Sequence, residues 1–238
     1  MSMFGYNTLG FGSIAGTAPV TLDLTLQGGS VSRTNATYTG VSIGTANTNR
    51  MVIIQGAVSS YGSITAPTSI TLNGTAMTLV RNAYNVFIAY LKVPTGTTAT
   101  IVISGGGGAF NQQIITINTV NAGANQTSIQ SGSAAGNGGS LTHTMTTDPV
   151  TTNGVFIWGG NGFNGIPNLS LLTSNPSGAT TTLSYSSGSG GSNNAMLMGY
   201  SECTTADSRN AQIRNTNTET SGKVASALYS VFTYFQTE

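Results

Sequence analysis

The sequence contains few charged residues: they make up 5% of 238 residues, with seven Lys and Arg against six Asp and Glu. A soluble domain ordinarily carries about 25%. Seven basic residues and a net charge of +1 are too little to form a basic surface along a phosphate backbone, so nucleic-acid binding is not expected. Lys, Glu and Arg also coat most helix surfaces, so their scarcity argues against an all-α fold.

Cysteine and histidine are nearly absent as well. The single cysteine excludes a disulfide framework within the chain, and one His with one Cys is too little for a zinc site. No run of about 18 apolar residues occurs, so membrane insertion is not expected. Residues 1–16 lack the basic and apolar regions of a secretory signal. We therefore expect no metal ion and no cofactor, and we expect the protein to be assembled in a cytoplasm.

Short runs of alternating or continuous apolar residues are abundant, and they predict β-strands. Val20–Gln27 alternates between apolar and polar residues, as a half-buried strand does, whereas Met51–Val58 is continuously apolar and predicts a central strand. Asn73-Gly74 between two such runs predicts a hairpin with a type I′ turn. Ser140–Thr147 is polar and predicts an edge or lumen-facing strand, and Lys223–Gln236 predicts a central one.

About twelve strands separated by Gly, Pro and Asn turns are predicted in total. The remaining predicted strands are Ile70–Leu72, Ala76–Val80, Val86–Val93, Thr98–Ser104, Gln113–Val120, Gly154–Trp158, Thr180–Ser186, Asn194–Thr204 and Ala211–Asn215. Pro94-Thr95-Gly96 predicts a turn between two of them. The pattern favours an all-β fold, either an antiparallel β-sandwich of jelly-roll type or a closed barrel.

No step in composition marks a domain boundary, so residues 20–238 are predicted to form a single β-sandwich domain. The glycine-rich stretch 121–139 is its weakest joint. Weak internal sequence similarity relates segments on either side of this stretch. Arg50–Ile54 resembles Asn153–Trp158, and Ala89–Leu91 resembles Ala195–Tyr200. Two half-sandwich units are therefore an alternative to one continuous sandwich.

Residues 1–19 differ from the rest, because large apolar residues alternate there with glycine. The aromatic and aliphatic residues are Phe4, Tyr6, Leu9 and Phe11. Exposed on a monomer, they would form an unusual apolar patch. The segment is either a strand of its own sandwich or an arm buried against another chain. We predict a docking arm, with these four residues making the contacts.

One motif matches that of a serine hydrolase. Gly40–Gly44 reads G-x-S-x-G around Ser42, and His143 and Asp148 would have to complete a triad. The motif requires a helix directly after the serine, and none is predicted here. A chance match is the better interpretation in a chain rich in Gly and Ser, so no catalytic residue is predicted.

Two further patterns are weak signals of ligand binding. Gly160–Gly165 reads G-x-G-x-x-G after a strand, but Pro167 interrupts the helix that a dinucleotide site needs, so a Gly-rich loop is expected. Glu202 and Asp207 could share a loop and hold calcium with backbone carbonyls. No such site is predicted from so scattered a set of acids.

Aromatic residues in predicted loops are the candidates for contact with a sugar. An aromatic face surrounded by polar groups is a usual platform for stacking in a ligand site. Tyr61, Phe110 and Phe163 occupy such positions, each beside glycine or other loop-forming residues. They are the predicted ligand-contact residues if the protein binds a host surface glycan.

The whole chain resembles a virion structural protein of a tailed bacteriophage. The resemblance rests on the arm Phe4–Ser13, on the charge-poor body rich in Thr, Ser, Asn and Gly, and on one run of elements. That run is Arg50–Val58, the Asn73-Gly74 hairpin and Lys92–Gly96, and it is similar to the small sandwich domains on phage surfaces. The resemblance implies a non-enzymatic protein on the outside of a virion, and it carries over no functional residue.

Two functions from different classes follow. The first is a capsid decoration protein or a head or tail fibre, anchored by residues 1–19 and assembled in the host cytoplasm. Its partners would be other virion proteins and further copies of itself, a trimer among the options. The scarcity of lysine on exposed strand edges also favours an oligomer. The alternative is a lectin-like module that recognises host surface glycans.

Overall fold

The computed structural model describes the backbone of residues 23–29, 36–59, 67–81, 86–105, 112–121, 128–137, 140–146, 154–163, 167–175, 180–187, 194–203, 210–217 and 227–236. The regular structure in these ranges consists of seventeen β-strands, which form four sheets. Every pairing between strands is antiparallel. The prediction of an all-β chain with antiparallel sheets is confirmed.

Two sheets are built from the N-terminal half, residues 23–121. We call the first inner sheet 1, and its strand order is β1 (Asp23–Gly29), β9 (Gln112–Asn121), β3 (Arg50–Ser59), β7 (Val86–Lys92) and β6 (Thr78–Arg81). The second is outer sheet 1, in the order β2 (Ala36–Ser42), β8 (Thr98–Ser104), β4 (Ser69–Leu72) and β5 (Thr75–Ala76).

Two more sheets are built from the C-terminal half, residues 128–236. Inner sheet 2 has the order β10 (Ser128–Asn137), β17 (Ala227–Gln236), β12 (Gly154–Phe163), β15 (Asn194–Cys203) and β14 (Thr180–Ser187). Outer sheet 2 has the order β11 (Ser140–Thr146), β16 (Asn210–Asn217) and β13 (Pro167–Asn175).

The two halves repeat the same strand order. We number the strands of each half from 1 to 8 in chain order and count β5 and β6 together as strand 5. In each half, strands 1, 8, 3 and 6 then lie side by side in the inner sheet. The second, seventh and fourth lie side by side in the outer sheet. The two pairs of similar segments in the sequence fall on equivalent strands, namely β3 with β12 and β7 with β15. The expectation of one domain over residues 20–238 stays a prediction.

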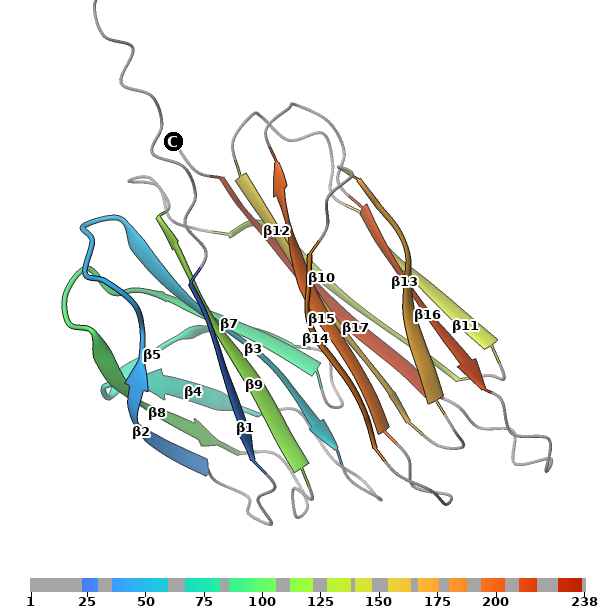
Figure 1. Ribbon diagram of the computed structural model, residues 1–238, viewed down its shortest axis with the longest axis horizontal. Coiled ribbons are helices and arrows are strands. Elements are labelled where there is room, and N and C mark those ends of the chain that lie inside the picture. Colours follow the sequence, from blue (N-terminus) through green and yellow to red (C-terminus); the bar gives the residue numbers. More distant parts are fainter. Residues whose placement is uncertain are drawn as a thin grey trace, which may run out of the picture.

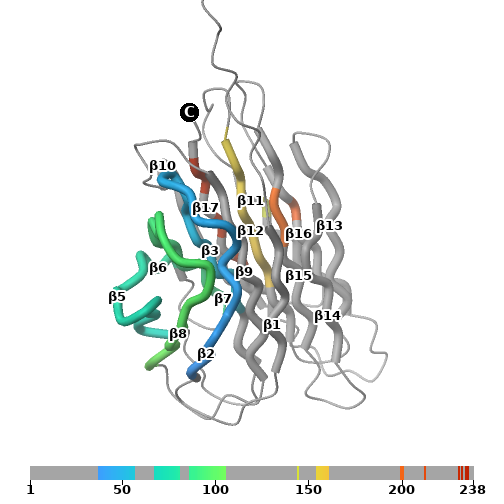
Figure 2. Tube along the Cα trace, turned by 60° about the vertical axis from the view of Figure 1, so that its left-hand side comes forward, coloured from blue at the N-terminus to red at the C-terminus, as the bar shows by residue number. Residues whose placement is uncertain are grey.

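The four sheets are stacked in layers (Figure 1). Outer sheet 1 packs on inner sheet 1, inner sheet 1 packs on inner sheet 2 through β3, β6 and β7, and outer sheet 2 covers the far side of inner sheet 2. Figure 2 shows the first part of this order from another side, with β2 and β8 separated from β12 by β3. Equivalent sheets therefore meet at the centre, as equivalent surfaces do in a twofold dimer.

Strand β3 is buried on both faces, which explains its continuous apolar run. Its residues Val52 and Ile54 face outer sheet 1 and join the core there with Phe87 of β7. The alternate residue Ile53 is also fully buried, on the face that inner sheet 2 covers. The prediction of a central strand is confirmed here, and for β17, which lies between β10 and β12.

The predicted hairpin at Asn73-Gly74 is confirmed. Both residues have positive φ angles, 48° and 81°, as a type I′ turn requires. Asn73 also holds the turn against β8, because its Oδ1 accepts a hydrogen bond from Thr100 N at 2.8 Å and its own N donates to Thr100 O at 2.8 Å.

Replacing Gly74 tests this turn. Gly74→Ala finds open space around its Cβ, so only the backbone conformation opposes it. We expect a loss of about 1 kcal/mol in the free energy of unfolding. Urea titration checks it, with Thr75→Ala as the exposed neighbour that should change stability by less than about 0.5 kcal/mol. Equal stability of Gly74→Ala and wild type would contradict the turn.

The phenol of Tyr38 supplies a test of burial on β2. Tyr38 is half-buried against the core, and this burial raises the pKa of its hydroxyl. A raised folded pKa means that its contribution to stability is complete below about pH 10 and is lost as the pH rises above that value. We expect Tyr38→Phe to lose less stability than wild type between pH 9 and 11, measured by urea unfolding. Parallel pH profiles would contradict this burial.

Other predictions about strands need correction. Two strands were not predicted from the sequence, namely β10, which lies within the glycine-rich stretch 121–139, and β13 over Pro167–Asn175. Residues 160–163 of the G-x-G-x-x-G match continue β12 rather than forming a loop. The predicted turn at Pro94-Thr95-Gly96 is confirmed, because it joins β7 to β8 and Gly96 has a φ of 78°. The two strands lie in different sheets, since β7 pairs with β3 and β8 pairs with β2 and β4.

Candidate functional site

Most of the predicted site residues lie outside the described residues. These are the arm residues Phe4, Tyr6, Leu9 and Phe11 and the ligand-contact candidates Tyr61 and Phe110. Phe163 is the last residue of β12, where the structure describes the backbone alone. Their proposed roles remain predictions, but the described strands fix where the chain leads to and from them.

The strands adjoining the three ligand-contact candidates end at the same end of the molecule. Ser59, two residues before Tyr61, pairs with Gln112, two residues after Phe110. Strand β12 runs in the same direction as β3. Tyr90, which pairs with Ile53, contacts Phe235, which pairs with Val155.

Gln55 lies two residues after Ile53 on β3, and it bonds to Trp158, which lies three residues after Val155 on β12. The two strands therefore advance in the same direction. Ser59 and Phe163 therefore both lie at what we call the far end. The chain enters β1 at Asp23 at the opposite end, which we call the entry end, because Asp23 pairs with Thr119, and Thr119 pairs with Val52.

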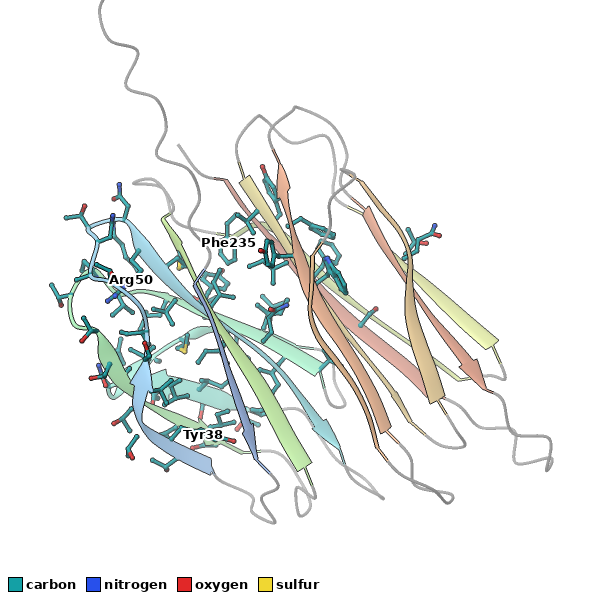
Figure 3. The ribbon with its side chains drawn as sticks, viewed as in Figure 1. Tyr38, Arg50 and Phe235 are labelled. Atoms are coloured by element: carbon teal, nitrogen blue, oxygen red, sulfur yellow. The ribbon has the colours of Figure 1, made fainter. Side chains whose placement is uncertain are left out.

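Among the described residues, an organised group of polar atoms lies at the entry end, around Arg50. Arg50 is the first residue of β3, and its side chain is labelled in Figure 3. It is 1% exposed. Its guanidinium donates five hydrogen bonds, each to a backbone carbonyl oxygen. The acceptors are Val93 O at 2.8 Å, Ile43 O at 3.1 Å, Gly44 O at 2.8 Å, Thr95 O at 2.7 Å and Gly96 O at 2.8 Å.

These acceptors belong to two segments, residues 43–49 and 93–97, which we call the Arg50 loops. Local sequence shapes each one. Asn47 turns the first, because its Oδ1 accepts from Asn49 N at 2.8 Å and its carbonyl oxygen accepts from Arg50 N at 3.0 Å. Gly96, with φ of 78°, turns the second. Ile43 N donates to Thr97 O at 2.9 Å and joins the two loops directly.

The chemistry of Arg50 follows from this geometry. A guanidinium has five N–H donors, and all five are used on the Arg50 loops. Burial lowers the pKa of Arg50, but arginine stays charged at neutral pH. No donor is left for a phosphate or carboxylate ligand. Arg50 therefore acts by ordering the two loops rather than by binding an anion.

A second buried polar side chain joins the two halves. Gln55 is 1% exposed and lies on the face of β3 that inner sheet 2 covers. Its Nε2 donates to Trp158 O at 2.8 Å and to Gly199 O at 3.1 Å, on neighbouring strands β12 and β15. The sequence pointed to neither Arg50 nor Gln55 as a key residue. The available signal was a polar residue at each end of the apolar run Met51–Ile54.

The structure does not bring the hydrolase candidates together. Ser42 is exposed at the end of β2 in outer sheet 1, whereas His143 belongs to β11 in outer sheet 2, at the opposite side of the stack. Glu202 lies in strand β15 rather than in a loop, and Asp148 and Asp207 lie outside the described residues. Among the described residues, no three His, Cys, Asp or Glu side chains gather as a metal site would require.

Comparison with known proteins adds no relative. The chain matches no protein-family model, no curated protein and no solved structure. In the part of the chain that the structure describes, no helix is long and apolar enough to cross a membrane. The proposals about function therefore depend on the strand order and on the two ends of the molecule.

Proposed function

We propose that this protein is a non-enzymatic structural component on the exterior of a bacteriophage virion, made of two jelly rolls in tandem. The observation that carries the proposal is the repeated strand order. In the N-terminal half, strands 1-8-3-6 lie side by side in one sheet and strands 2-7-4-5 in the other, and this arrangement supports the jelly-roll assignment. Jelly rolls are common in viral capsid proteins and in lectins.

The C-terminal half supports the same assignment. Its inner sheet contains the equivalents of strands 1-8-3-6, and its outer sheet contains the equivalents of 2-7-4. The fifth strand, β14, pairs with β15 alone, whereas its counterpart in the N-terminal half is divided between both sheets as β5 and β6. One difference at a sheet edge leaves the shared order intact.

The difference between the two ends of the molecule suits a protein that is anchored at one end and projects at the other. Residues 1–19 precede β1, whose first residue, Asp23, lies at the entry end. The strands beside the ligand-contact candidates end at the far end. An arm at one end and ligand contacts at the other would let the protein attach to a particle and present its far end outward. Capsid decoration and a head or tail fibre both use this arrangement.

Particle composition tests the proposal. Particles of the phage that encodes the chain are purified on a density gradient, and copies are counted by quantitative mass spectrometry and located by cryo-electron microscopy. We expect the full chain on the particle exterior and expect a chain lacking residues 1–19 to be folded but absent from particles. Absence of the full chain from particles would overturn the proposal, and normal incorporation of the shortened chain would overturn the arm.

A lectin-like module is the second candidate, because the strands beside Tyr61, Phe110 and Phe163 end together. Weak glycan contacts there would be strengthened by several copies on one particle. A panel of host surface glycans should then show saturable binding that weakens in Tyr61→Ala, Phe110→Ala and Phe163→Ala. A panel without binding would remove this candidate and leave the structural role unaffected.

A further inference from the structure

We propose that the interior of the C-terminal half, between inner sheet 2 and outer sheet 2, binds a small, largely apolar molecule through one oxygen atom. This oxygen would accept a hydrogen bond from the indole nitrogen of Trp158. The inference goes beyond the virion role and does not depend on it.

The indole of Trp158 carries a donor without an acceptor. The side chain is 0% exposed, and among the described residues its Nε1 has no hydrogen-bond partner. A buried tryptophan N–H usually finds a partner, because a donor that stays unpaired away from water lowers stability. Such a donor in a folded protein therefore requires an explanation, and an acceptor supplied by a ligand is one.

The strand register shows on which side of the sheet this indole lies. Val155 of β12 pairs with Phe235, whose ring contacts Tyr90 of inner sheet 1 with 4.8 Å between the ring centroids. Since side chains alternate along a strand, Trp158 lies on the opposite face of inner sheet 2. Outer sheet 2 covers that face, so the unpaired donor is inside the C-terminal half (Figure 1).

The repeated strand order supplies a comparison for the space beside Trp158. Gly160, the next residue on the same face, is seventh in β12, as Gly56 is seventh in β3. In the N-terminal half the ring of Phe87 occupies the place of the missing side chain, since a Cβ on Gly56 would overlap it. Phe87 is the partner of Gly56 on β7, whereas the partner of Gly160 on β15 is the smaller Leu197.

The other strands differ in the same direction. Beyond the glycine, the row of paired residues in the N-terminal half continues with Ile115 of β9 and Gln27 of β1. The equivalent residues of the C-terminal half are Ser230 of β17 and Ala134 of β10, and both are smaller. Each partner in the row of Gly160 is therefore smaller than its counterpart.

The row of Trp158 does not compensate for this difference. Two of its residues are larger than their counterparts in the N-terminal half, and two are smaller. They are Trp158 for Ile54, Phe232 for Ile117, Gly199 for Ala89 and Gly132 for Thr25. Because protein interiors are closely packed, a shortage of side-chain volume in one row leaves space there. The space beside Gly160 is the proposed binding site.

The charges of this half indicate a neutral ligand. The charged residues in its described strands are Glu202 and Arg214. Glu202 pairs with Val155 and so is on the face toward inner sheet 1, and Arg214 lies two residues after Gln212, which pairs with the exposed Thr144. Neither is on a face between inner sheet 2 and outer sheet 2. A ligand there would be held by burial of its apolar surface and oriented by the indole N–H.

Two glycine variants test the space without a ligand. Gly160→Ala adds a methyl group beside Trp158 and should leave the melting temperature unchanged or raise it. Gly56→Ala is the matched control at the equivalent position, where the methyl group meets the ring of Phe87. It should lower the melting temperature by about 5 °C. A loss of the same size in Gly160→Ala would overturn the proposal, because the space would then already be filled.

A matched pair of ligands tests the donor. The sequence contains one tryptophan, so the indole N–H of Trp158 gives a single resonance in a proton–nitrogen correlation spectrum. Cyclohexanone and methylenecyclohexane share a ring and an exocyclic double bond, but only the ketone has an acceptor oxygen. We expect cyclohexanone to move this resonance downfield in a saturable titration and to bind at least about tenfold more tightly than methylenecyclohexane.

Gly160→Val fills the proposed space and keeps the indole, so it should weaken the binding of cyclohexanone at least about tenfold. A titration that does not saturate, equal binding of both ligands, or wild-type binding by Gly160→Val would overturn the proposal. An indole resonance that neither ligand moves would do the same, since water or a protein group would then hold the donor. None of these outcomes bears on the incorporation of the chain into particles, which is measured separately.

Discussion

Arg50→Met is expected to lower the free energy of unfolding by about 3 kcal/mol, since hydrogen bonds from a charged donor each contribute more than neutral ones and five are lost together. The loss should be local. In hydrogen exchange, the amides of Ile43, Arg50 and Val93, which bond within and between the Arg50 loops and β3, should exchange faster than in wild type. Amides of β12 should keep their protection.

Two variants separate the geometry of Arg50 from its charge. Arg50→Lys keeps the charge, but an ammonium has three donors at one point and cannot reach both loops, so it should be nearly as destabilising as Arg50→Met. Lys92→Met removes an exposed cation from the last residue of β7 and should change stability by less than about 0.5 kcal/mol. Wild-type stability of Arg50→Lys would contradict the role given to the fork of five donors.

Gln55→Glu is expected to be the other strongly destabilising change, with a loss of about 4 kcal/mol at pH 7. The variant places a carboxylate against the carbonyl oxygens of Trp158 and Gly199, which now accept hydrogen bonds from Nε2 at 2.8 and 3.1 Å. Burial and these dipoles would raise the pKa of the new carboxyl above its unfolded value of about 4.3.

The sign of the pH effect follows from this raised pKa. The variant should be closest to wild type below pH 4.3 and should lose stability as the pH rises towards the folded pKa. Urea unfolding of wild type and variant at pH 4, 5, 6 and 7 measures the difference. Gln55→Met, which removes the amide without adding a charge, should lose about 1 to 2 kcal/mol at every pH. A constant difference between Gln55→Glu and wild type would contradict a buried carboxyl.

The sequence predicted the elements whose local signals are strong. The continuous run Met51–Val58 became the buried strand β3, and Asn73-Gly74 became a turn with two positive φ angles. Ser140–Thr147 contains β11, an edge strand of outer sheet 2 as its polar residues predicted. In each of these cases the pattern within about ten residues decides the structure.

Other elements depend on partners far away in the chain. Residues 128–137 are rich in Ser, Gly and Ala and have little β-propensity, yet they form β10 because β17 pairs with them along the strand, with one register shift between Ser128 and Gln130. Arg50 is one of only seven basic residues in the sequence, but the five carbonyl groups that accept its hydrogen bonds lie 6 to 46 residues away. Gln55 bonds to residues 103 and 144 positions away. No local pattern specifies such contacts.

The central interface also bears on how the chain could have arisen. If the two halves descend from one duplicated unit, that unit would have met its copy through the surface that the inner sheets now bury, as a symmetric dimer. Position six of β3 is Gln55, and position six of β12 is Gly159, so a projecting amide on one half has a residue without a side chain as its counterpart on the other. A chain with two N-terminal halves would bring two such amides to one seam. The two halves therefore differ at this position of the seam, where the amide of one half bonds to backbone carbonyl oxygens of the other.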